Sequence, residues 1–189
     1  MENYKFFRER NADSVRDEYE IIVPTSEELE KELKNKLVEK LSMIDVIFDS
    51  VARAEYLKVK GKDIPKGVSE VVVKQKIGLR VLVDFLDLTI SLCMVCGFNY
   101  EELLIYNDNY LVDGGIFKEL FIEAVNKIAS EKTNEENIKG LAQAVMMLVN
   151  NLKLDIDVVE EERLKVEKAE GSFLNGKILK PKSVLDEQN

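Results

Sequence analysis

Hydrophobic positions along most of the chain recur every three to four residues, which is the period of an α-helix. The first stripe begins after Pro24 and predicts a helix from Thr25 to about Lys60, opened by a capping box of Thr25 and Glu28. Its apolar positions are Leu33, Leu37, Leu41, Ile44, Phe48 and Val51. A second helix is expected over residues 69–96. Because it is apolar on nearly every side, it belongs in the middle of a bundle.

The pattern after residue 96 predicts shorter helices separated by turns. Gly97 ends the second helix, and a third, capped by Asn99 and Glu102, reaches about residue 112. Further helices are expected over 117–131, 134–151 and 155–168, with a capping box of Thr133 and Glu136 before the middle one. One short β-like run covers residues 19–23, and the last sixteen residues look like a mainly polar tail. The expected fold class is therefore all-α.

The helical pattern also repeats at an offset of 56 residues. Residues 84–117 then align with residues 140–173, although few positions are identical. An ancient duplication and two unrelated helical hairpins both stay open as explanations. Under a duplication, residues 1–115 hold the first repeat with an N-terminal extension, 116–180 hold the second, and 181–189 form a polar tail. The fold is then a helical bundle of two repeats, a pseudo-dimer within a single chain.

Composition removes several kinds of chemistry. The 189 residues include no histidine, which excludes Ser-His-Asp and Cys-His catalysis and histidine-bound zinc or iron. A net charge of -9 disfavours nonspecific binding to nucleic acid or to an anionic membrane face. No stretch of eighteen apolar residues and no signal-like N-terminus are seen, so we expect a protein of the cytoplasm with no membrane partner.

Two carboxylates in the second predicted helix are its most informative feature. Asp84 and Asp87 are three residues apart, so they share one face of the most apolar helix. In the first helix, Asp45, Asp49 and Glu39 are possible companions. If the two helices pack antiparallel, these acids converge, and such a cluster of oxygen ligands suits Mg²⁺ or Mn²⁺. The alternative is an ordinary Arg80–Asp84 ion pair, with Asp87 at the edge of the bundle.

Other polar motifs are less specific. The pair Cys93 and Cys96 matches C-x-x-C, but it lies near the C-terminal end of an apolar helix, where core packing is the better interpretation. A basic loop contains Lys58 and Lys60, which could contact phosphate groups or simply be solvated. In the third predicted helix, Asn107 could supply an amide to a polar ligand.

These parts together resemble the all-α nucleoside triphosphate pyrophosphatases, the superfamily of MazG, phosphoribosyl-ATP pyrophosphohydrolase and the dimeric dUTPases. The family pattern has an E-E-x-x-E-type segment on one helix and E-x-x-D on the next; Asp84-Phe-Leu-Asp87 stands at the second of these. The segment from Val159 to Phe173, with Gly176-Lys-Ile-Leu179, resembles the family's closing segment. The segment 36–43 has one acid where the family has three, and Gly140-Leu-Ala-Gln143 has lost both E-x-x-D acids.

The resemblance implies a nucleotide pyrophosphohydrolase that uses Mg²⁺ (or Mn²⁺) to convert a nucleoside triphosphate to a monophosphate and pyrophosphate. It places Asp45, Asp49, Asp84 and Asp87 as metal ligands and Glu39 or Asp45 as the catalytic base. Lys58, Lys60, Arg80 and Asn107 are then the candidate substrate contacts. The second repeat closes the core as a partner subunit does in the family's dimers, and a homodimer stays open. The rival is a catalytically inactive nucleotide-binding or protein-interaction scaffold of the same fold.

Overall fold

The computed structural model describes residues 19–22, 26–63, 73–104, 114–170, 172–174 and 177–181. The helices in it are α2 (Ser26–Val59), α4 (Leu79–Cys96), α5 (Tyr100–Leu103), α6 (Gly114–Ser130), α7 (Glu135–Leu152) and α8 (Ile156–Glu170). A π-helical turn, η2 (Val73–Gly78), leads into α4. The strands are β1 (Tyr19–Ile22), β2 (Ser172–Leu174) and β3 (Lys177–Pro181). The prediction of a helical bundle is confirmed, and a small sheet is added to it.

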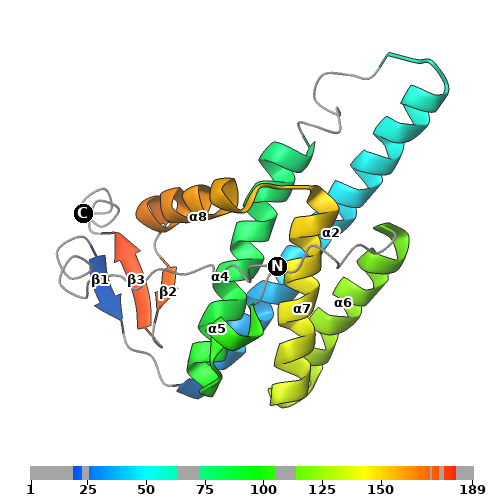
Figure 1. Ribbon diagram of the computed structural model, residues 1–189. Coiled ribbons are helices and arrows are strands. Elements are labelled where there is room, and N and C mark those ends of the chain that lie inside the picture. The colour runs from blue at the N-terminus through cyan, green and yellow to red at the C-terminus, as the bar shows by residue number, and fades with distance from the viewer. Residues whose placement is uncertain are drawn as a thin grey trace.

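Four helices form the core of the bundle. Helix α2 packs against α4 and α6, and α7 packs against the same two helices, so that the four close a ring (Figure 1). Neighbours in this ring run antiparallel (Figure 1). Helix α5, which follows α4, contacts α7, whereas α8, which follows α7, contacts α4. Among the described residues no helix combines the length and the apolar character needed to cross a lipid bilayer.

Helix α4 is the central element, as its apolar pattern predicts. Most of its residues are buried, from Leu79 to Cys93, and it contacts α2, α7, α8 and β2. The buried hydroxyls of Thr89 and Ser91 donate hydrogen bonds to the carbonyl oxygens four residues earlier, so neither polar group lacks a partner. Gly97 has φ 77°, a left-handed conformation that glycine adopts without a steric penalty, and it ends the helix as expected.

Aromatic rings connect three of the core helices. Phe121 of α6 meets Phe85 of α4 edge to face, with ring centroids 4.8 Å apart. Phe117, one turn earlier in α6, lies 5.7 Å from Phe121 and 5.5 Å from Phe48 of α2. Because Phe85, Phe117 and Phe121 are fully buried, this cluster fixes how α6 sits against α2 and α4.

The sheet joins two distant parts of the chain. Its strand order is β1-β3-β2, both pairs are antiparallel, and Tyr19 pairs with Pro181 while Phe173 pairs with Ile178. The β-like run near residue 21 is therefore a strand, as predicted. The expectation of a polar tail after residue 173 is wrong for β3. Short strands have weak local patterns, and β3 is paired on one side with its neighbour β2 and on the other with β1, at the other end of the sequence.

Several predicted helix ends also change. The capping box before α7 is made by Asn134 and Asn137, not by Thr133 and Glu136. The third predicted helix is helical only to Leu103 in the described part, since Leu104 is no longer helical and residues 105–113 lie outside it. The proposed cap Thr25 and the predicted helical residues 69–72 also lie outside the described residues.

The aromatic cluster leads to a stability prediction. Replacing Phe121 by Ala removes its contacts with Phe85 and Phe117, and should lower the free energy of unfolding by about 3–5 kcal/mol. The neighbouring change Leu120→Ala, at a side chain that is 43% exposed, should cost about 1 kcal/mol or less. Urea unfolding followed by circular dichroism measures both, and equal losses would contradict the assigned packing of α6.

Candidate functional site

The two carboxylates Asp84 and Asp87 lie on α4, one turn apart, where the helix is otherwise apolar. Their side chains are only 13% and 16% exposed, and Val83, Phe85 and Leu86 beside them are fully or almost fully buried. Removing a carboxylate from water is costly unless a cation or several hydrogen bonds compensate it. Each of the two should therefore have a nearby positive partner.

Asp84 has two such partners. Lys40 of α2 donates from Nζ to Asp84 Oδ2 at 2.5 Å, and Arg80, one turn earlier on α4, donates from Nε to Oδ1 at 3.3 Å. The Arg80–Asp84 pair is the ion pair that the sequence spacing of four residues within one helix suggested. Lys40 adds a bridge between α2 and α4 that spacing within one helix does not reveal.

Asp87 is held by a third helix. Arg163 of α8 lies with Nη1 3.4 Å from Asp87 Oδ1, and its side chain is only 11% exposed. The Nε atom of Arg163 is buried and makes no hydrogen bond within the described part of the chain. The ion pair attaches α8 to α4, so the two carboxylates connect α4 to helices on two different sides.

Asp45 and Asp49 lie elsewhere. Lys118 of α6 is 2.7 Å from Asp45 Oδ1 and 3.5 Å from Asp49 Oδ1, and both carboxylates are largely exposed. Hydrogen bonding to Asp45, with the charges of both carboxylates, raises the pKa of Lys118. Since Lys40 and Asp45 are five residues apart, they point about 140° apart around α2. Lys40 therefore faces α4, whereas Asp45 and Asp49 face α6.

The four carboxylates expected to share a metal ion are thus divided between two places. Among the described residues no group of three or more acidic or cysteine side chains is placed to hold a metal ion. Asp84 and Asp87 offer two carboxylates, and both are already paired with cationic side chains, Lys40, Arg80 and Arg163. A divalent ion would have to displace Lys40, so the residues as arranged do not fit Mg²⁺.

The remaining site candidates do not join this cluster. Glu39 is exposed on α2, where its backbone carbonyl accepts a hydrogen bond from the hydroxyl of Ser42. Lys58 and Lys60 are exposed at the far end of α2, where Lys60 lies over the ring of Tyr56. At 1.5 Å per residue, Lys58 is about 27 Å farther along the helix than Lys40. Asn107 lies outside the described residues.

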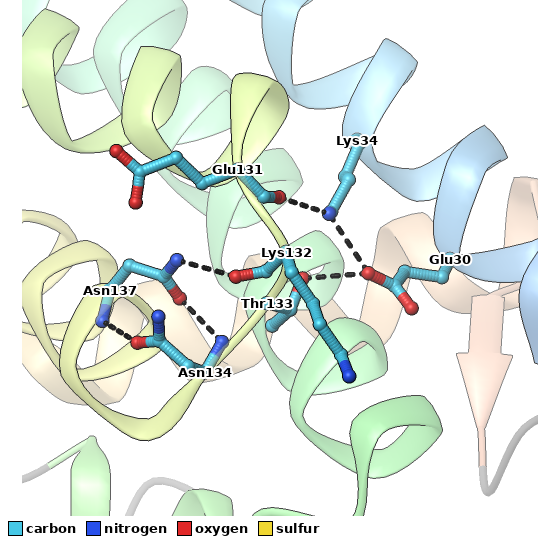
Figure 2. A network of polar contacts seen from close by, with 7 residues as sticks. All are labelled: Glu30, Lys34, Glu131, Lys132, Thr133, Asn134 and Asn137. Atoms are coloured by element: carbon cyan, nitrogen blue, oxygen red, sulfur yellow. Dashed lines mark hydrogen bonds and ion pairs between the residues drawn. The ribbon is translucent and has the colours of Figure 1, made fainter.

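A separate polar network joins the start of α2 to the turn between α6 and α7 (Figure 2). Glu30 accepts from Lys34 at 2.9 Å and from the hydroxyl of Thr133 at 2.8 Å. Lys34 also donates to the carbonyl oxygen of Glu131, as Figure 2 shows. Burial raises the pKa of Glu30, but the hydrogen bonds from Lys34 and Thr133 outweigh it, so the pKa lies below its usual value. This network is structural, because every member is satisfied by another.

The cysteines behave as core residues. Cys93 is fully buried, and Cys96 is partly buried beside Glu30 and Thr133. Burial raises the pKa of Cys93 to about 12, and it also raises that of Cys96. Because the thiolate is the reactive form, neither geometry nor protonation suits a redox pair.

Comparisons with known proteins identify no family for the chain. A scan against family models, a search of curated proteins and a search of solved structures return no significant match.

The network around Glu30 predicts a pH dependence. Since its pKa is lowered by folding, Glu30 stabilises the protein above the pKa of the unfolded chain, and this contribution disappears as the pH falls through the lower, folded value. Glu30→Gln should therefore be less stable than wild type at pH 7, and the difference should shrink below about pH 4.5. Urea unfolding at several pH values measures it, with Glu32→Gln as the exposed control; a difference independent of pH would contradict the assignment.

The thiols give a second prediction. In a Cys96→Ser variant, the remaining thiol of Cys93 should react with a disulfide reagent only as fast as the protein unfolds, because it is buried and protonated. In a Cys93→Ser variant, Cys96 should react sooner but still more slowly than a free thiol. Labelling followed by absorbance, with and without urea, tests both; fast labelling of native Cys93 would reopen the redox interpretation.

Proposed function

We propose that the protein is a non-hydrolytic relative of the all-α nucleoside triphosphate pyrophosphatases, in which ion pairs have replaced the metal site. The observation that carries this proposal is the contact between Lys40 and Asp84. When the E-E-x-x-E pattern is aligned on Glu39, Lys40 stands at the second acid and Met43 at the third. A cation thus occupies an acid position of the family pattern and neutralises the carboxylate that remains across from it.

The charge balance of the cluster supports the same proposal. Lys40, Arg80 and Arg163 contribute three positive charges against the two carboxylates. An added divalent cation would therefore have to compete with these side chains for the carboxylate oxygens, which disfavours its binding. In a cluster of acids without these cations, the opposite would hold, and a metal ion would relieve the repulsion.

The arrangement of the helices supports a duplicated, single-chain pseudo-dimer. The pair α2–α4 packs against the pair α6–α7, and the helix that follows each pair reaches the opposite pair: α5 contacts α7 as well as α4, and α8 contacts α4. Such an exchange is what two copies of one helical unit related by a pseudo-two-fold axis would produce. At the offset of 56 residues, α4 also aligns with α7.

An active Mg²⁺-dependent pyrophosphohydrolase is the second candidate. It is favoured by the survival of both Asp84 and Asp87 on one face of α4, with Lys40, a side chain that is 41% exposed, as the group that would have to leave. The two candidates differ in whether the wild-type protein responds to a divalent ion.

Charge reversal at Lys40 tests the proposal. Lys40→Glu should lower the melting temperature in EDTA, because it sets a new carboxylate against Asp84. Mg²⁺ or Mn²⁺ should then restore part of the loss, since a ligand that binds only the folded state stabilises it, by about 2.7 kcal/mol at a hundred times its dissociation constant. Wild type should show no metal-dependent rise in melting temperature and no release of pyrophosphate from a panel of nucleoside triphosphates.

The matched control is Lys36→Glu, one turn earlier on α2, where the lysine pairs with the exposed Glu32. It should cost about 0.5 kcal/mol and gain no response to metal. Metal-dependent stabilisation and pyrophosphate release by wild type would overturn the proposal in favour of the enzyme. A Lys40→Glu variant that ignores metal would show that Lys40 is not what replaces the ion.

A further inference from the structure

A hollow of about 330 Å³ lies between α6 and α7, away from the ion-pair cluster on α4. Ala124 and Lys127 line it from α6, and Glu136, Lys139, Gly140 and Gln143 line it from α7. Its volume is at the lower end of the range that small-molecule sites occupy. It is also formed between two regular helices, so its walls are held by the core of the bundle.

Two of the residues that line the hollow, Ala124 and Gly140, are small. Gly140 stands in the interior of α7, where glycine costs about 1 kcal/mol relative to alanine. No heavy atom lies within 4 Å of the position that a Cβ atom of Gly140 would occupy, so packing does not require the glycine. Its effect is to leave space beside Ala124.

The rim carries groups that suit an anion. Lys127 and Lys139 supply two ammonium groups, and Gln143 supplies a side-chain amide. The opposing charge is Glu136, whose carboxylate is 87% exposed and lies 3.5 Å from Lys127 Nζ. A pair this exposed is weak, so a ligand with two or more negative charges can compete with Glu136 for Lys127.

The position of the hollow matches that of the carboxylates in the first half. At the offset of 56 residues, Gly140 aligns with Asp84 and Gln143 with Asp87. In the first half, the two carboxylates bind the nearby cations of α2, α4 and α8. Under the proposed duplication, open space and lysines in the second half thus correspond to the acid–cation pairs of the first.

We propose that the hollow between α6 and α7 binds a phosphate-bearing small molecule without a divalent cation. Its phosphate oxygens would accept hydrogen bonds from the ammonium groups of Lys127 and Lys139, while an uncharged part would rest on Ala124 and Gly140. Lysine is suited to this role as a compact point charge with three donors. The proposal does not depend on the absence of hydrolysis at Asp84, because the two places share no residue.

Calorimetric titration of the full chain with inorganic pyrophosphate and with adenosine monophosphate, both in EDTA, tests the proposal. Wild type should bind at least one of these probes, more weakly as salt is added. Lys127→Gln and Lys139→Gln should each weaken binding about tenfold or more, because each removes a charge-assisted hydrogen bond. Glu136→Gln should tighten binding about two- to fivefold, since it removes the competitor for Lys127.

Gly140→Leu is the decisive variant. Leucine has a higher helix propensity than glycine, and its Cβ meets no atom, so the variant should fold with an unchanged or higher melting temperature while its side chain fills the hollow and abolishes binding. Lys31→Gln, at an exposed lysine on α2, is the charge control and should change affinity less than twofold.

Three results would overturn the proposal: no binding of either probe by wild type, binding that survives Gly140→Leu, or equal losses in Lys31→Gln and Lys127→Gln. Because EDTA is present and no turnover is measured, these results are independent of the metal and pyrophosphate assays. An active hydrolase at Asp84 would leave the expected outcome here unchanged.

Discussion

The bundle depends on the neutralisation of two carboxylates in its most buried helix. Asp84 and Asp87 interrupt an otherwise apolar α4, and a cation from another helix helps to compensate each of them: Lys40 from α2 and Arg163 from α8. Apolar packing alone allows helices to slide or rotate with little change in energy, whereas a buried ion pair is costly to break. These two contacts therefore select one register for α2 and α8 on α4.

The same charges limit the chemistry of that region. Carboxylates that are paired with lysine and arginine stabilise a fold, whereas carboxylates that repel one another favour the binding of a metal ion. With Lys40 beside it, Asp84 is in the first of these conditions. In α7, by contrast, Gly140 and Gln143 line a hollow that carries no buried carboxylate among its lining residues.

Local patterns in the sequence predicted much of the fold. Periodicity predicted the central burial of α4 and the strand near residue 21. Glycine geometry predicted the end of α4 at Gly97, and thiol chemistry predicted the packing of Cys93. The pairing of Asp45 with Lys118 and the sheet partner of β1 did not follow, because both depend on which element covers a given face. Asp45 adjoins the apolar stripe of α2, but only the position of α6 decides that it turns away from α4. The contact of Lys40 with Asp84 did not follow from the sequence either, because the two residues are 44 positions apart.

The sheet has a consequence for the order in which the chain can fold. Strand β1 precedes all of the described helices, but its partner β3 follows all of them, with Tyr19 paired to Pro181. During synthesis, α2 and α4 can associate long before β3 leaves the ribosome. Until then, β1 lacks the strand with which it pairs. Contacts between such distant residues form slowly, because a long loop has to close first. The helical bundle thus forms first and brings the two ends of the chain together, and the sheet is the last element to form.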